Sequence, residues 1–389
     1  SLTPVMAAKN ASFTVVNGWE RVEYFKPSED FQPSLSFHFD ETFNIVAREV
    51  SNVRDNVGLC EVNGFNRFEI TGSDSQSFID RLFCGNITHK PGRVGLGYLL
   101  NDFGMVKSEA TIANIPASDR GPNRMWYGSA AASEFHDMDW LSQHINPDEN
   151  VKIKSLTNDQ TILIVAGPKA REVISACSRE DWSKEAFPWL SVRECFIGFS
   201  AATVMSVSFS GELAYEVHVP NSSLYAAYLS LSEVGKEYGM KLFGSRAVES
   251  MRMEKGFLVW KSDLLTEFDP FETGLDRFVN LNKDNFIGKA DLEKRFKNGP
   301  NQKLVCLSID CNHAPAHAGA SLMEDSKVIG TITSGEWGHR VNLNLAYAFV
   351  NPDKSKPGTK MMLDLLGEMI PVEVILQGPY DSSYSRILT

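Results

Sequence analysis

The spacing of apolar residues between positions 43 and 145 predicts alternating helices and strands. FNIVAREVSNVRDNVGL, which starts at Phe43, repeats apolar residues every three or four positions, as an amphipathic helix ending near Gly58 does. NRFEITG, at 66–72, alternates apolar and polar residues, which is typical of a strand. The same patterns continue in order: a helix at 73–86, a strand–turn–strand hairpin at 93–114, a strand at 124–132 and a helix at 133–145.

A second series of strands and helices begins at Val151. Its most informative stretch is SVSFSGELAYEVHVP at 206–220, which predicts a strand, a Ser-Gly turn and a second strand. The order of strands and helices resembles that of the first half, so we expect two related α+β units. The remaining segments predict strands at 151–159 and 160–167, and helices at 168–177, 222–239 and 246–257.

Both ends of the chain differ from this pattern. After residue 300, short strands are separated by Gly, Pro and Asn turns, which predicts a small β-barrel unit. The first forty residues are rich in aromatic side chains and irregular, so we expect an extension that packs over the body. The fold class is therefore α+β, with this division: 1–40 as an aromatic-rich extension, 41–150 with 240–295 as one α+β unit, 151–239 as the second, and 300–389 as the barrel.

Composition narrows the classes of partner. The net charge of −11 argues against a nucleic-acid partner, and no apolar run reaches the roughly 20 residues that cross a membrane. The start of the chain lacks the pattern of a secretory signal. The six cysteines fit no zinc or redox spacing and the histidines fit no metal spacing, so we predict reduced thiols and no metal site. These features indicate a cytoplasmic protein, or one of the mitochondrial matrix if eukaryotic.

Several motifs, spread over nearly the whole chain, carry a resemblance to a known family. They are GWERVEYF, NRFEITGSDSQSFIDRLFCGNI, GRVGLGYLLNDFGMV, FSGELAYEVHVP, ESMRMEKGFLVWKSDL and TSGEWGHRVNLNLAYAFV. In this order they resemble the folate-binding half of dimethylglycine and sarcosine dehydrogenases, and through these the aminomethyltransferase of the glycine cleavage system. The resemblance implies two related α+β units and a small C-terminal β-barrel around a central channel that takes tetrahydrofolate.

The resemblance also implies a catalytic carboxylate at Glu109, on the second arm of the predicted hairpin. The family carries an acidic residue there, near the reacting folate nitrogens. A carboxylate at this place can orient the nitrogen, act as a general base or stabilise positive charge on the transferred group. The alternative is an ordinary solvent-facing glutamate on a hairpin arm.

Folate-binding residues are expected on the strand at 206–220 and on the helix after it. A strand that presents a carboxylate and a helix that presents a guanidinium can together hold a flat, polar ligand. The resemblance assigns the pterin ring to Glu216, with Tyr215 beside the ring, and a folate contact to Arg252. The alternatives are a cross-strand ion pair for Glu216, a core position for Tyr215 and a salt bridge from Arg252 to Glu249 or Glu254. Further pocket candidates, on strands or loops that the family places around the channel, are Tyr98, Tyr127, Ser129 and Trp260.

These residues predict a tetrahydrofolate-dependent one-carbon transferase or demethylase that acts on a small methylated amine, sulfonium compound or methyl ether. Two alternatives stay open: the folate module of a flavin-dependent dehydrogenase of methylated amines, and a non-catalytic regulatory protein of the same fold. The sequence contains no GxGxxG loop, so FAD, if it takes part, is expected on a separate domain or partner protein.

Overall fold

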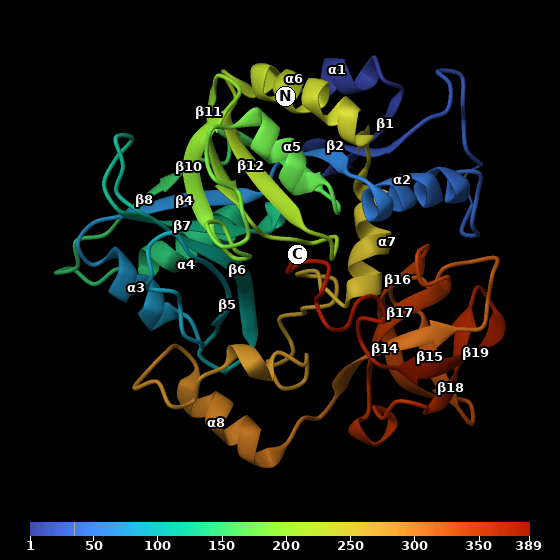
Figure 1. Cartoon of the computed structure of the whole chain (residues 1–389). Coiled ribbons are helices and arrows are strands. Elements are labelled where there is room, and N and C mark those ends of the chain that lie inside the picture. The colour runs from blue at the N-terminus through green and yellow to red at the C-terminus, as the bar shows by residue number, and fades with distance from the viewer. Residues whose placement is uncertain (35) are drawn as a thin grey trace.

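The computed structural model describes residues 1–34 and 36–389 and contains two sheets, a closed barrel and an N-terminal hairpin (Figure 1). The N-terminal segment is more regular than the sequence predicted. Its turn holds Asn17 and Gly18 at φ 51° and 83°, which is the Asn-Gly pair typical of a two-residue hairpin and which the aromatic composition obscured. The elements before this turn and after it are α1 (Thr3–Ala7), β1 (Ala11–Val16) and β2 (Trp19–Phe25).

The first sheet has five strands in the order β5-β6-β7-β4-β8. One face packs on two helices through a core that includes Phe68, Ile112 and Tyr127. This face takes every second residue of β6, so the residues between them point to the opposite face. The elements are β4 (Asn66–Thr71), α3 (Ser75–Leu82), β5 (Val94–Leu100), β6 (Val106–Ile115), β7 (Arg124–Ser129), α4 (Glu134–Gln143) and β8 (Lys152–Ser155).

The second sheet has six strands in the order β10-β11-β12-β9-β3-β13. Helices α5 and α6 cover one face, and α2 and α7 cover part of the other. Figure 1 shows α7 running between this sheet and the barrel. The elements are α2 (Phe43–Asp55), β3 (Gly58–Val62), β9 (Gln160–Ala166), α5 (Ala170–Cys177), β10 (Val192–Ile197), β11 (Ser200–Met205), β12 (Ala214–Pro220), α6 (Leu224–Gly235), β13 (Lys241–Leu242) and α7 (Ser245–Lys255).

Three strands lie outside the units drawn from the sequence: β3 and β13, from the ranges 41–150 and 240–295, join the second sheet, and β8, from 151–239, joins the first. Strand β3 pairs with β9 and β13 of the second sheet, whereas β8 pairs with β4 of the first. The predicted strand at 206–209 is also absent, because β11 ends at Met205 and a loop follows. In this loop the hydroxyls of Ser208 and Ser210 accept hydrogen bonds from backbone N–H groups, and such local bonds compete with strand pairing.

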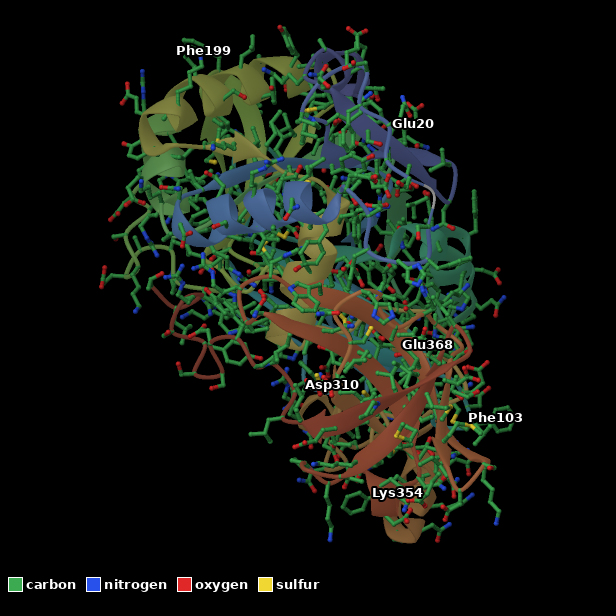
Figure 2. The ribbon with its side chains drawn as sticks, turned by 90° about the vertical axis from the view of Figure 1, so that its right-hand side faces the viewer. Glu20, Phe103, Phe199, Asp310, Lys354 and Glu368 are labelled. Carbon is green, nitrogen blue, oxygen red and sulfur yellow. The ribbon has the colours of Figure 1, made fainter. Side chains whose placement is uncertain are left out.

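The C-terminal unit confirms the predicted small β-barrel. Its six strands close in the order β14-β17-β16-β15-β18-β19 around a core of aliphatic residues. Figure 2 shows this barrel at the end of the molecule that carries Lys354 and Glu368, opposite the end that carries Phe199. The elements of this part are α8 (Lys289–Asn298), β14 (Lys303–Ile309), β15 (Ser321–Glu324), β16 (Lys327–Gly338), β17 (Leu343–Val350), β18 (Lys360–Leu365) and β19 (Glu368–Ile375).

A buried ionic network joins these parts at the centre of the molecule. Arg54 of α2 pairs with Glu212 at 3.0 Å and with Glu254 of α7 at 2.6 Å, and all three side chains are fully buried. The C-terminal segment adds Arg386, whose Nε lies 2.9 Å from Glu212, and Tyr380, whose ring lies under the Arg54 guanidinium. The C-terminal segment therefore packs against this network, and its last two residues, Leu388 and Thr389, are exposed.

Candidate functional site

Glu109 lies in the middle of β6, directly opposite Tyr98 on β5. The Tyr98 hydroxyl donates a 2.6 Å hydrogen bond to Glu109 Oε2. Tyr98 is almost fully buried, whereas Glu109 keeps part of its surface accessible. One carboxylate oxygen is thus held by the protein, and this oxygen fixes the orientation of the group.

The environment of Glu109 raises its pKa to about 7. Burial is the main cause, since protein encloses the carboxyl group on nearly all sides although one part stays accessible. The negative charge of Asp263 raises the pKa further, and the hydrogen bond from Tyr98 opposes both effects. A carboxyl group with a pKa near neutrality can exchange a proton at physiological pH, as a general acid or base must.

Glu216 lies on β12 of the second sheet and stands opposite Met205 on β11. Its side chain is 27% exposed, and its Oε2 lies 3.2 Å from Nε2 of the fully buried His218. The His218 ring packs edge-on against Trp126 of the first sheet, with centroids 5.0 Å apart. His218 therefore supports the Glu216 carboxylate from behind and leaves part of it accessible.

Glu109 and Glu216 stand on the faces that the two sheets turn toward each other. An apolar cluster joins these faces and includes Ala113 of β6, Trp126 of β7 and Met205 of β11. Glu109 shares the face of Ala113, because residues four apart on a strand point the same way, and Glu216 shares the face of Met205. The structure thus places two partly accessible carboxylates, one from each sheet, in the same inter-sheet region.

Tyr215 does not lie beside Glu216, because neighbouring residues of a strand point to opposite faces. Its ring is 0% exposed and packs against Trp182 and Phe187 in the core under α5 and α6. The structure gives Tyr215 the core position that the sequence left as the alternative, and not a place beside a ligand ring bound to Glu216.

Tyr127 and Ser129 also lie away from Glu109. Ser129 stands opposite Ala110, so both β7 residues face the helices and not the second sheet. Their hydroxyls donate 2.7 Å hydrogen bonds to the buried Asp137 of α4. Both residues therefore belong to a polar network inside the first unit.

Trp260 lies at the end of β6 where the strand begins, and its ring is 5.6 Å from the His136 ring of α4. Its indole N–H donates a 3.2 Å hydrogen bond to the carbonyl of Lys107, which points from β6 two residues before Glu109. Its ring packs in the apolar cluster that also contains Tyr98. Trp260 thus shares an apolar cluster with Tyr98, the hydrogen-bond partner of Glu109.

Arg252 is engaged by protein partners. The side chain is 1% exposed; Nη1 lies 2.7 Å from Asp263 and bonds the Phe257 carbonyl, while Nε lies 3.0 Å from Glu249. The salt bridge to Glu249 is the alternative named from the sequence, whereas Glu254 pairs with Arg54. The structure therefore engages the Arg252 guanidinium with protein groups, among them Asp263.

Two groups that the sequence analysis did not single out belong to this region. Asp263 follows Trp260 closely and accepts hydrogen bonds from Thr333 and Ser334 of the barrel, so it links the barrel to the site. Arg67 lies on β4 next to Phe68, which packs against the helices. Because neighbouring residues of a strand point to opposite faces, Arg67 points toward the second sheet, and this alternation is visible in the sequence. Among the residues that the structure describes, no group of His, Cys, Asp and Glu side chains could hold a metal ion.

Comparison with known families now adds to this geometry. Residues 2–283 match the GCVT N-terminal domain, and residues 302–381 match the glycine cleavage T-protein C-terminal barrel domain. Among solved structures, the glycine cleavage system aminomethyltransferase T from Bartonella henselae superposes with a TM-score of 0.84 at 19% identity, over 98% of this chain and 97% of that one. This similarity establishes the fold.

Curated relatives are longer than this chain. Mitochondrial dimethylglycine dehydrogenase of Homo sapiens is 32% identical over 93% of this chain and 41% of its own length. Sarcosine oxidase subunit alpha of Rhizobium meliloti (strain 1021) is 29% identical over 88% of this chain and 36% of its own. The mitochondrial pyruvate dehydrogenase phosphatase regulatory subunit of Mus musculus is 25% identical over 96% of this chain and 43% of its own length. The chain therefore spans about two-fifths of the length of these relatives. Because it matches both the N-terminal domain and the C-terminal barrel of the glycine cleavage T-protein (GCVT) family, it belongs to that family.

Proposed function

We propose that the chain transfers a one-carbon unit from a small methylated substrate to tetrahydrofolate. The observation that carries the proposal is the pair of partly accessible carboxylates, Glu109 and Glu216, on facing sheets of a GCVT-family fold. Tetrahydrofolate, when bound, supplies the nitrogen that accepts the one-carbon unit. The chain's own residues hold the ligand, exclude water and control the proton.

Glu216 anchors the pterin ring in this proposal. The ring edge presents an N–H and an amino group side by side, and the two oxygens of one carboxylate can accept both hydrogen bonds. His218, which lies 3.2 Å from Oε2, keeps the carboxylate in place. The partial exposure of Glu216 leaves an edge at which the ligand can bind.

Glu109 orients the reacting nitrogen and exchanges its proton. Tyr98 holds Oε2, which leaves Oε1 to accept a hydrogen bond from the ligand. The pKa of about 7 allows Glu109 to take up or release a proton at neutral pH. As a carboxylate it also stabilises positive charge that develops on the transferred group.

A methylated amine is the donor that the relatives favour, over a sulfonium compound or a methyl ether. Their printed names include dimethylglycine dehydrogenase, sarcosine oxidase subunit alpha and 4-methylaminobutanoate oxidase. Because the chain spans about two-fifths of such relatives, we infer that it works as the folate module of a flavin-dependent enzyme, with FAD on a separate domain or partner. Its compartment in this proposal is the cytoplasm or, in a eukaryote, the mitochondrial matrix.

A single-turnover transfer assay tests this proposal. Sarcosine and related secondary amines condense with formaldehyde, with loss of water, to the iminium that oxidation of dimethylglycine would give. They would be offered with formaldehyde and tetrahydrofolate, and the folate product would be followed by chromatography. We expect Glu109→Gln to lower the transfer rate about 100-fold or more, which is the usual contribution of a general acid or base, and to leave folate affinity nearly unchanged. Glu69→Gln is the matched control, since Glu69 shares the face of Arg67 but pairs with Arg124.

A regulatory protein is the second candidate, because the pyruvate dehydrogenase phosphatase regulatory subunit is 25% identical over 96% of this chain. A regulatory protein of this fold would bind tetrahydrofolate without turnover. The second candidate would be favoured over the enzyme by a wild type that binds tetrahydrofolate but transfers nothing from any donor. In that case the wild type and Glu109→Gln would show the same lack of transfer.

A further inference from the structure

Arg67 is a buried cation between the two sheets with unused hydrogen-bond donors. Its side chain extends from β4, opposite Gly128 of β7, and the residue is 1% exposed. Nη2 donates a 2.9 Å hydrogen bond to the carbonyl of Thr157. Among the residues that the structure describes, Nε and Nη1 have no partner.

Unpaired donors on a buried guanidinium are unusual and costly. A buried donor without an acceptor destabilises the folded state, and the cost is larger on a charged group. Burial lowers the pKa of Arg67 to about 10, so the side chain is still a cation at neutral pH. The fold therefore maintains a desolvated donor fork that its own acceptors do not satisfy.

The charges around Arg67 indicate which kind of acceptor it would bind. Glu216 and Glu134 are the acidic groups that act on it electrostatically, although neither lies within ion-pair distance. Burial lowers the pKa of His218, so this neighbour is neutral at pH 7. One cation and two carboxylates give the cluster a net charge of −1. A further anion would be repelled, so a neutral acceptor such as a carbonyl oxygen fits better.

We infer that Arg67 donates a hydrogen bond to the carbonyl oxygen at position 4 of the pterin ring. This oxygen lies beside the two ring donors whose hydrogen bonds Glu216 accepts. The inference rests on the proposed folate function and adds a specificity-determining residue to it. A 2-amino-4-oxo ring edge presents donor, donor and acceptor in a row, and a carboxylate next to a guanidinium presents the complementary groups. Arg67 lies close enough to Glu216 for their charges to interact, and its unused N–H groups are the donors that the ligand oxygen would meet.

From the sequence, the resemblance assigns a folate contact to Arg252, whose planar donor fork suits a pterin oxygen or a glutamate carboxylate. Arg252 bonds Glu249, Asp263 and the Phe257 carbonyl, whereas Arg67 keeps two donors free. The choice between these two arginines therefore follows from how fully each guanidinium is already used by the protein.

A binding cycle with two ligands and three variants tests the inference. Tetrahydrofolate carries an oxygen at position 4, and its 4-amino analogue carries a donor there, which two facing N–H groups would oppose. Calorimetry would give Kd for both ligands with wild type, Arg67→Met and Arg67→Lys. Arg124→Gln is the control, because Arg124 lies on the next strand and pairs with Glu69 and Glu194.

We expect Arg67→Met to raise the Kd for tetrahydrofolate about tenfold or more, the effect of losing a hydrogen bond to a charged group, and to leave or improve the Kd for the 4-amino analogue. Arg67→Lys should lose part of the same selectivity, and Arg124→Gln none. If Arg67→Met does not fold, as judged by thermal melting, the Lys variant decides in the same way. Equal changes for both ligands, or no change, would overturn the role of Arg67. Failure of the wild type to bind either ligand would instead overturn the proposed function.

Discussion

The Tyr98 hydroxyl donates a single 2.6 Å hydrogen bond to Glu109. This bond lowers the pKa of Glu109, while burial and the charge of Asp263 raise it. Tyr98→Phe removes the one opposing effect, so we expect the pKa to rise above about 7. If the carboxylate is the active form, the acidic limb of the pH–rate profile of one-carbon transfer then moves to higher pH.

Tyr127→Phe is the matched control for this prediction. Its hydroxyl also bonds a carboxylate, Asp137, but on the opposite face of the same sheet. We expect it to lower stability without moving the pH–rate profile. A profile that is the same in Tyr98→Phe and in the wild type would show that Tyr98 does not set the state of Glu109.

The sequence and the structure differ in how much they reveal about single residues. Glu109 and Glu216 stand in motifs that resemble a known family, so both could be named from the sequence. The complete set of partners of Arg252 could not be named from the sequence. One of them, Asp263, is held by Thr333 and Ser334, which lie about seventy residues away along the chain. Arg67 was missed because no local motif shows which of its donors the fold leaves unused.

At the scale of elements, Arg54 joins α2, α7 and the loop before β12. We expect Arg54→Met to lower the free energy of unfolding by about 3–5 kcal/mol, because it leaves Glu212 and Glu254 buried with one cationic partner fewer. Urea unfolding would measure this change. Arg81→Met is the control: its pair with Glu149 is partly exposed and should cost less than about 1 kcal/mol. Similar losses in both variants would contradict the central role of the network.

Local patterns located most elements but not their partners. The hairpin of β5 and β6 and the helices α3 to α7 lie where apolar spacing predicted them. Apolar spacing does not specify which sheet a strand joins, so the places of β3, β8 and β13 were not predicted. The loop at 206–213 alternates like a strand, yet its serine side chains satisfy the backbone locally.

At the scale of the whole molecule, the last residues hold the parts together. Asp381 pairs with Lys255 of α7 at 3.0 Å, and Arg386 pairs with Glu212 at 2.9 Å. We expect removal of residues 379–389 to lower the melting temperature of the entire chain in one cooperative transition, since Lys255 and Glu212 would lose partners in a buried region. An unchanged melting temperature, or melting of the barrel alone, would contradict this arrangement.

The stability of the whole protein should also depend on pH. Burial raises the pKa values of Glu49, Glu109 and Glu336 to about 7, whereas in the unfolded chain they return to ordinary values near 4.5. Between these values the folded state binds more protons than the unfolded state, so the free energy of unfolding falls as pH rises from about 4.5 to 7.

Glu109→Gln isolates one of these contributions, because an amide stays neutral throughout. We compare the free energy of unfolding of this variant with that of the wild type at pH 8 and at pH 5. The difference between variant and wild type should be about 1–3 kcal/mol more favourable to the variant at pH 8 than at pH 5. Chemical denaturation at the two pH values measures the gain, and Glu69→Gln, on a carboxylate paired with Arg124, should show none. A gain of the same size at both pH values would mean that the charge of Glu109 is not the cause.

The most direct test of the folate site is a calorimetric titration of tetrahydrofolate into wild type, Glu216→Ala and Glu69→Ala. We predict that the wild type and Glu69→Ala bind with equal affinity. Loss of the charge-assisted hydrogen bonds should weaken binding to Glu216→Ala about tenfold or more. Equal affinities for all three proteins would contradict a folate site at Glu216, and no binding to the wild type would contradict a folate function for this chain.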